Sequence, residues 1–328
     1  MRMLVLGGTA WLGGSVARRA LEEAWEVTCL ARGESGTTPP GAAAVTADRT
    51  SPGAYDEVRD RDWDAVVDVS RQPGQVRSAL HALGQRTGHW TFVSTGNVYA
   101  DLSSPISEGS PLRAPVTGDV VGVEEYGEGK AACEQAVASL PHHLIWRAGL
   151  LGGPGDPSDR FGYWVSRFAL AGSGEVLVPD IVAQPVQVLD VRDLADWIVR
   201  AATEGVTGVL NAAGDQVPFG PVLDSAESVA GFTGSRVAAD PQWLLDHDVQ
   251  HWAGPRSLPL WLPDDSLGMT QMSVIRARGA GFAARSLEET LRATLADERS
   301  RGLDRERRAG LTRADELALI ADRSVSAR

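Results

Sequence analysis

The beginning of the chain constrains its fold most strongly. The apolar run at residues 3–6 is typical of a buried parallel strand. The glycine-rich stretch 7–14 follows at once, and residues 15–23 then show the apolar periodicity of a helix. Glycines let a backbone approach a diphosphate closely, and a helix N-terminus offers N–H groups and a positive dipole end. The segment therefore predicts the first half of a dinucleotide-binding βαβ unit.

Two alternatives compete with this interpretation. The phosphate loop of nucleoside triphosphatases needs a lysine after its second glycine, and although Gly8, Gly13 and Ser15 have the right spacing, Gly14 stands at the lysine position. This departure excludes ordinary phosphate-loop chemistry. A plain strand–turn–helix connection that binds nothing stays open as the second alternative.

The second predicted strand, residues 27–30, is followed by Ala31 and Arg32. Enzymes that use NAD normally place Asp or Glu here to hold the ribose 2′-hydroxyl, whereas Arg accommodates a 2′-phosphate. Arg32 therefore favours NADP over NAD. Glu34 keeps NAD open, and a solvated loop arginine is the alternative without a ligand.

Further apolar segments recur at 42–45, 65–69, 90–94 and 144–147, with helical patterns between them. Such alternation predicts an α/β fold with a doubly wound parallel sheet of the Rossmann kind. Ligands bind at the carboxyl ends of the strands in these sheets. Ser94 and Thr95 end the fifth predicted strand, so a hydroxyl there can hydrogen-bond a reacting carbonyl or alcohol.

Tyr126 and Lys130 form the second informative pair. Lys130 is the only lysine of the chain, whose other basic side chains are all arginines. An ammonium is a compact charge that a forked guanidinium does not replace. Residues i and i+4 share a helix face, and a nearby ammonium lowers the pKa of a phenol toward the working pH. The pair is therefore a candidate proton donor and acceptor.

Together these features resemble the extended short-chain dehydrogenase/reductase family, also called the NAD(P)-dependent epimerase/dehydratase family, in an atypical branch. The resemblance spans about residues 1–211. The matching segments are the glycine stretch 7–13, the strand end 94–99, Tyr126 with Lys130, the Arg-Ala-Gly run with its following glycines at 147–156, and the segment 186–195.

The resemblance implies that Tyr126 is the acid/base, that Lys130 binds the nicotinamide ribose and lowers the tyrosine pKa, and that Thr95 occupies the family's Ser/Thr position. Asp48 matches the position that reaches adenine, and Val69 with Ser70 matches the segment that lines the nucleotide. The full expected cofactor set is Gly7, Thr9, Ala10, Trp11, Leu12, Gly13, Arg32, Asp48, Arg49, Val69, Ser70, Ser94, Tyr126, Lys130, Ala148, Gly149 and Leu150.

Departures from the family pattern narrow the chemistry. Ala10 stands at the middle glycine of the turn, as in outlying branches. Gly96 and Asn97 stand where the 4,6-dehydratases carry an Asp-Glu pair, so elimination of water lacks its acid and base. Leu150 replaces the Asn that holds the sugar pyrophosphate in nucleotide-sugar epimerases.

We therefore expect an NADP(H)-dependent oxidoreductase that moves hydride at a carbonyl or secondary alcohol. A sugar epimerase with an internal redox cycle and a non-catalytic NADP-sensing protein are the alternatives. The expected domains are residues 1–156 plus 185–212 for the nucleotide, and 157–184 plus 213–328 as a smaller C-terminal substrate-binding cap.

The substrate is expected to be a small molecule. Asn97, Arg160 and Trp164 are candidate substrate residues, with core packing as the alternative for the tryptophan. The proline-rich loop 101–118 is either a lid or a passive surface loop.

Composition sets the remaining bounds. A net charge of −12 argues against nucleic acid, and no apolar run approaches the ~20 residues of a membrane span. Cys29 and Cys133 fall in a predicted strand and helix, which suggests reduced thiols and a cytoplasmic protein. His247 and His251 lack a third ligand, so no metal is expected. A homodimer, a capping box at 286–289 and a short helix near 314–321 complete the expectations.

Overall fold

The computed structural model describes residues 1–326. The chain divides into two compact units, each of which combines separate segments. The first unit contains Met1–Gly149, Val191–Ala213 and Met272–Ala283, and the second contains Leu150–Asp190, Gly214–Gln271 and Ala284–Arg328. Compared with the expected domains, residues 150–156 and 185–190 belong to the second unit, and 272–283 return to the first.

The first unit is built on a seven-stranded parallel sheet in the order β10-β6-β5-β4-β1-β2-β3. Its strands are β1 (Arg2–Leu6), β2 (Glu26–Ala31), β3 (Ala43–Thr46), β4 (Trp63–Asp68), β5 (Thr87–Thr95), β6 (His143–Ala148) and β10 (Gly208–Ala212). This sheet confirms the doubly wound α/β fold expected from the sequence.

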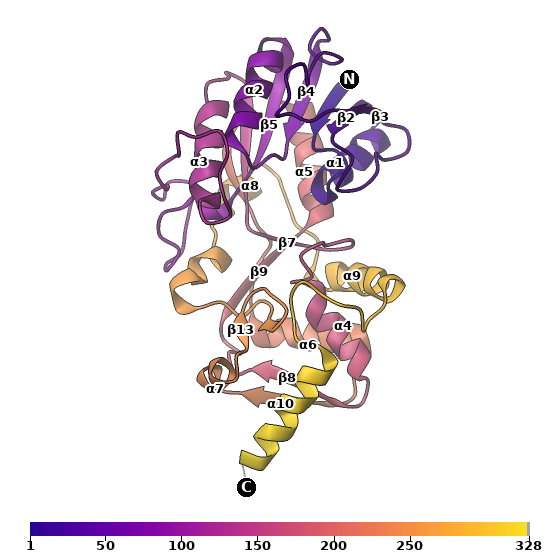
Figure 1. The fold of residues 1–328 in the computed structure, drawn as a ribbon, viewed down its shortest axis with the longest axis vertical. Coiled ribbons are helices and arrows are strands. Elements are labelled where there is room, and N and C mark those ends of the chain that lie inside the picture. The colour runs from indigo at the N-terminus through magenta and orange to yellow at the C-terminus, as the bar shows by residue number, and fades with distance from the viewer. Residues whose placement is uncertain (327–328) are drawn as a thin grey trace. The chain divides into compact units, whose positions relative to one another are not determined.

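Helices cover both faces of this sheet (Figure 1). α1 (Trp11–Glu22) packs with α5 (Val191–Glu204), and α2 (Pro73–Leu83) packs with α3 (Tyr126–Val137). The short helices of the unit are η1 (Gly84–Arg86), η2 (Gly96–Val98) and α8 (Ile275–Gly279). Because both faces are covered, β1 is buried from Met3 to Leu6, as its continuous apolar run predicts.

The glycine stretch is more helical than the sequence pattern suggests. α1 begins at Trp11, four residues before the predicted start, and contains Gly13. A Cβ at Gly13 would lie 2.2 Å from the carbonyl oxygen of Gly7, so the first turn of α1 packs directly on the end of β1. A Cβ at Gly8 would lie 2.5 Å from Sγ of Cys29, which places that buried thiol on β2 beneath the turn.

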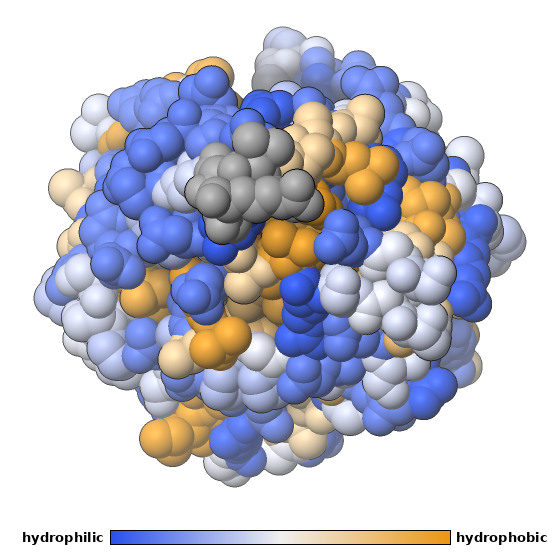
Figure 2. Space-filling model, turned by 90° about the horizontal axis from the view of Figure 1, so that it is seen from below, coloured by the Kyte–Doolittle hydropathy of each residue, from blue (hydrophilic) through white to orange (hydrophobic). Residues whose placement is uncertain are grey.

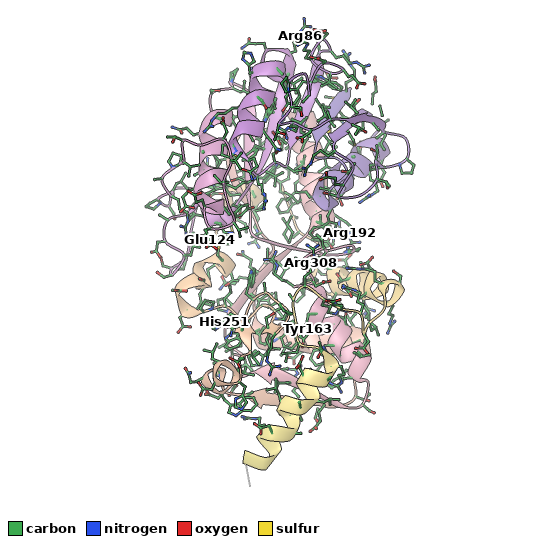
Figure 3. The ribbon with its side chains drawn as sticks, in the orientation of Figure 1. Arg86, Glu124, Tyr163, Arg192, His251 and Arg308 are labelled. Carbon is green, nitrogen blue, oxygen red and sulfur yellow. The ribbon has the colours of Figure 1, made fainter. Side chains whose placement is uncertain are left out.

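The second unit contains β7 (Leu150–Gly152), α4 (Gly162–Ala171), β8 (Glu175–Pro179), β9 (Pro185–Asp190), β11 (Gln216–Pro218), α6 (Phe219–Ala230), β12 (Ser235–Ala239), α7 (Pro241–Asp246), β13 (Gln250–His251), β14 (Ser257–Leu258), η3 (Asp264–Thr270), α9 (Leu287–Arg301) and α10 (Arg313–Ser326). Its strands form one three-stranded and two two-stranded sheets. Aromatic rings fill its core: Trp164 packs edge-on against both Tyr163 and Phe219. Figure 3 marks Tyr163 on α4 and His251 on β13.

The C-terminal helices follow the sequence signals. α9 begins after a complete capping box formed by Ser286 and Glu289, as predicted, and α10 is longer than the expected 314–321. Seen from the side of α10, the surface is mostly hydrophilic and carries separate hydrophobic patches (Figure 2). None of the helices in residues 1–326 combines the length and apolar character that a membrane span requires.

Candidate active site

The glycine turn after β1 has the backbone geometry of a diphosphate-binding turn. Gly7 has a φ of +93°, in the left-handed region that favours glycine, and a Cβ there would lie 2.7 Å from Cγ2 of Val69. Ala10 is the N-cap of α1 and offers no side-chain acceptor to the first turn of the helix. The start of α1 therefore keeps the donors and the positive dipole end that bind anions.

A cavity of about 800 Å³ opens beside this turn. Its walls are the glycine turn, the end of β2 and the connection from β4 into α2. Seven residues of the expected cofactor set line it: Gly7, Thr9, Ala10, Arg32, Arg49, Val69 and Ser70. The sequence missed the third wall, which contains Arg71, Gln72, Gly74, Gln75, Ser78, Asp119 and Val120.

Arg49 builds the floor of this cavity. Its guanidinium donates to both carboxylate oxygens of Asp68, at 3.0 and 2.8 Å, and also to Tyr55, Ser70 and the backbone of Gln75. Burial alone would raise the pKa of Asp68, but the Arg49 charge and the hydrogen bonds from Arg49 and Ser70 outweigh burial and lower it. The charge of Arg49 is therefore already neutralised within the protein.

Asp48 lies beside the cavity without lining it. Its carboxylate accepts from the backbone N–H and the hydroxyl of Thr50, at 2.9 and 2.8 Å, and these bonds lower its pKa. Its neighbours Ala47 and Thr50 do line the cavity. The adenine contact expected of Asp48 stays a prediction.

Arg32 stands at the rim of the cavity, where the end of β2 meets the following loop. It is exposed, and its guanidinium lies 3.0 Å from the carboxylate of Glu34, which also lines the cavity. The residue that favours NADP and the residue that favours NAD thus form an ion pair with each other.

The end of β5 holds the predicted hydroxyls. Thr95 is buried, and its Oγ1 accepts a hydrogen bond from the backbone N–H of Asn97 at 3.2 Å. The buried hydroxyl of Ser94 has no hydrogen-bond partner among residues 1–326. Ala148 of β6 pairs with Thr95 of β5, and the N–H of Gly149 donates to the carbonyl of Ala212.

Tyr126 is the first residue of α3, and Lys130 follows one turn later. Lys130 is buried, and its ammonium donates to the carbonyl oxygens of Ser70, at 2.8 Å, and of Val93. It also lies 4.2 Å from the centre of the Phe92 ring. Burial lowers the pKa of Lys130 to about 8. Because Ser70 lines the cavity, this lysine connects the cavity with the end of β5.

Two glycines let α3 pack closely on η2, which follows β5, and on the segment that precedes α3. A Cβ at Gly127 would lie 2.3 Å from the carbonyl oxygen of Asn97. A Cβ at Gly129 would lie 2.6 Å from Cγ2 of Val121. Farther along α3, Glu134 forms a buried ion pair with Arg147 of β6, with a shortest contact of 2.7 Å. These contacts bring Tyr126, Lys130 and Thr95 to one region of the first unit.

The loop 101–118 is tied to the first unit at several points. Ile106 is buried and accepts a hydrogen bond from Ser273, Arg113 donates its N–H to Val98, and the Glu108 carboxylate accepts from the N–H of Asn211. The loop then runs into a segment at 119–121 that lies on α2, where Gln72 exchanges two hydrogen bonds with the backbone of Val121.

The other expected residues lie in different surroundings. Trp11, Leu12 and Gly13 form the first turn of α1 and are not part of the cavity wall. Leu150 begins β7 and is buried in the second unit, which also holds Arg160 and Trp164.

The geometry of these last two residues is that of packed side chains. Trp164 is buried, with its indole N–H on the carbonyl of Pro259, and the guanidinium of Arg160 lies over the ring of Trp252. Packing accounts for Trp164 without a ligand.

No model of a protein family matches the chain, and no curated protein sequence matches it either. Solved structures do match over nearly the whole chain. The UDP-glucuronic acid 4-epimerase from Bacillus cereus, in complex with NAD, has a TM-score of 0.65 at 16% identity, covering 92% of this chain and 99% of its own. The UDP-glucose 4-epimerases from Thermus thermophilus, with NAD, and from Thermotoga maritima, with UDP-glucose, have TM-scores of 0.62 and 0.64 at 20% and 16% identity, covering 91% and 92% of this chain and 99% of each of theirs.

The chain shares the fold of these three structures. The match includes the second unit as well as the parallel sheet, because each comparison spans more than nine-tenths of both chains. At these identities the comparisons establish the shared fold alone.

The residues present fit a nicotinamide dinucleotide. A Cβ would close the cradle at Gly7 and Gly13, the start of α1 has no side-chain cap, and Ser94 offers an unpartnered buried hydroxyl within residues 1–326. Thr9, Ala10 and the β4–α2 connection line a cavity at the carboxyl ends of β1 and β4, which is where such sheets bind nucleotides.

Proposed function

We propose that the chain is a nicotinamide-nucleotide-dependent epimerase that inverts a carbon bearing a hydroxyl group by an internal redox cycle. The observation that carries this proposal is the position of Lys130, one helical turn after Tyr126 on α3, where its ammonium binds a backbone carbonyl of the cavity wall and one of β5. The fold shared with epimerases over both units favours the epimerase over a simple reductase.

A nicotinamide nucleotide held by the glycine turn and the cavity wall would supply the acceptor and later the donor of the substrate hydride. Tyr126 accepts the proton of the substrate hydroxyl while hydride leaves the carbon that bears this hydroxyl. It gives the proton back to the carbonyl oxygen when hydride returns to the opposite face of the carbonyl. The ammonium of Lys130 favours the phenolate form of Tyr126. The Thr95 hydroxyl orients the substrate oxygen.

Tyr126 acts as a base in the first half of each turnover and as an acid in the second half. No net oxidation occurs, because the carbonyl formed in the first half is reduced in the second. The enzyme therefore has reason to retain its nucleotide between turnovers, and a sugar nucleotide is the substrate class to test first, since the comparison proteins are named for UDP-sugars.

A second candidate is an NADP(H)-dependent oxidoreductase acting on a carbonyl or secondary alcohol. Two observations favour it: Arg32 lines the cavity at the position that accommodates a 2′-phosphate, and Leu150 offers no hydrogen bond to a sugar pyrophosphate. The same Tyr126 and Lys130 would serve it, with exchange of cofactor at each turnover.

Mass identification of nucleotide released from the purified, extensively dialysed protein separates these functions. Retained NAD(H) or NADP(H) supports the epimerase, and conversion of sugar nucleotides without added reductant completes the case. An empty protein that binds added NADPH more tightly than NADH supports the oxidoreductase. Failure to bind any nicotinamide nucleotide contradicts both.

A further inference from the structure

Arg71 lines the nucleotide cavity and belongs to the wall that the sequence did not reveal. It lies three residues after β4, and β4 pairs with β1 so that Asp68 stands opposite Leu6. The connection after β4 therefore lies beside the glycine turn after β1. Arg71 shares the cavity wall with Thr9 and Ala10 of that turn.

The side chain of Arg71 differs from the other two arginines of the cavity. Arg49 is committed to Asp68, and Arg32 is paired with Glu34. Arg71 is exposed, and within residues 1–326 it makes no hydrogen bond, ion pair or ring contact. It is thus the cation of the described cavity wall that is not already matched by a carboxylate.

The backbone on both sides of Arg71 is fixed. The N–H of Ser70 donates to Asp68 at 2.9 Å. Gln72 holds the backbone of Val121 through two hydrogen bonds of 3.1 and 2.8 Å. Because this backbone is already fixed, the Arg71 guanidinium can bind an anion at little further cost in backbone entropy.

We propose that Arg71 binds the diphosphate of the nucleotide, opposite the N–H groups of the glycine turn. The inference rests on the proposed function, since it needs a dinucleotide in the cavity. The diphosphate is common to NAD and NADP, so Arg71 sets the affinity for both. Arg32 lies after β2, on the other side of β1, and is placed for the 2′-phosphate that only NADP carries.

The test is to measure by calorimetry how tightly NAD, NADP, ADP-ribose and adenosine bind to wild type, Arg71→Gln and Arg32→Gln. A charge-assisted hydrogen bond to phosphate predicts that Arg71→Gln weakens NAD, NADP and ADP-ribose by about 10- to 100-fold and leaves adenosine unchanged. Arg32→Gln weakens NADP alone.

Arg86→Gln is the matched control. Arg86 is an exposed arginine paired with Asp62, next to the amino end of β5 and so at the opposite edge of the sheet (Figure 3). This variant binds all four ligands as wild type does, and thermal unfolding verifies that each variant folds.

The outcomes are distinct. If Arg71→Gln binds the nucleotides as tightly as wild type does, the role of Arg71 is overturned and the proposed function is unaffected. A loss confined to NADP reassigns Arg71 to the 2′-phosphate and also overturns the proposal. Absence of nucleotide binding by wild type removes the proposed function and this inference together.

Discussion

Lys130 donates a hydrogen bond to the carbonyl oxygen of Val93, two residues before Thr95 on the same strand. The bond fixes α3 in register with β5, and it does so through the only lysine of the chain. A strand and a helix from distant parts of the sequence are thus joined two residues before Thr95 and one helical turn after Tyr126. The ammonium is buried and donates to two backbone carbonyls, an arrangement that suits a compact charge better than a forked guanidinium.

Replacing Tyr126 by phenylalanine removes the proposed proton carrier and little else. We expect turnover to fall by about 10²- to 10⁴-fold, the usual contribution of general acid–base catalysis, with nucleotide affinity retained. Steady-state rates and binding titrations measure the two effects. Tyr163→Phe is the control, since that tyrosine is buried in the core of the second unit and does not line the cavity. Full activity of Tyr126→Phe would refute the mechanism.

Lys130 predicts a pH dependence of stability. Burial lowers its pKa from 10.5 to about 8, so the unfolded chain binds this proton more tightly than the folded protein does between those values. The free energy of unfolding should therefore rise with pH across this window, by on the order of 3 kcal/mol from this group. Urea unfolding of Lys130→Met should lack that rise. A variant with the same pH profile as wild type would show that Lys130 is not desolvated.

Gly127→Ala reverses a general rule. Replacing glycine by alanine within a helix usually stabilises a protein by about 0.5–1 kcal/mol. Here the added Cβ would lie 2.3 Å from the carbonyl of Asn97, so we expect lower stability and impaired turnover through displacement of Tyr126. Gly122→Ala, where the Cβ meets open space, should leave both unchanged. Thermal unfolding and rates decide between these outcomes, and a stabilised, active Gly127→Ala would contradict the packing described.

The Arg49–Asp68 pair predicts an acid-sensitive cavity floor. Asp68→Asn leaves the Arg49 charge buried without its partner, which costs about 3–5 kcal/mol at neutral pH. The folded-state pKa of Asp68 is lowered, so the pair's contribution is present above about pH 3.9 and is lost as pH falls through the folded-state pKa. The gap between wild type and variant should narrow accordingly in urea unfolding. Asp62→Asn, at an exposed pair, should change stability by less than about 1 kcal/mol.

Local sequence signals predicted the sheet well. Buried parallel strands have continuous apolar runs, so β1, β2, β4, β5 and β6 were recognised from hydrophobicity alone. The start of α1 was misplaced because Gly13 reads as a turn residue. In the structure Gly13 is helical, and its missing side chain admits the carbonyl of Gly7.

The candidate site was only partly predictable. Tyr126, Lys130 and the glycine turn have characteristic spacings. The wall that contains Gln72 and Val120, in contrast, depends on hydrogen bonds between Gln72 and the backbone of Val121, 49 positions away. Such a contact between an amide side chain and a backbone has no sequence pattern. Arg71 shows the same limit, because only the structure distinguishes its exposed side chain from that of Arg49, which is buried and paired with Asp68.

The glycine turn rests on a thiol, because a Cβ at Gly8 would lie 2.5 Å from Sγ of Cys29. Burial raises the pKa of Cys29 to about 11, so the group is both covered and protonated at neutral pH. Below the midpoint of unfolding, we expect an alkylating reagent to reach it when the turn lifts away from β2. In a protein with Cys133 replaced by alanine, the rate at which Cys29 is labelled therefore reports how often the turn opens. A nucleotide that binds to the turn should lower this rate.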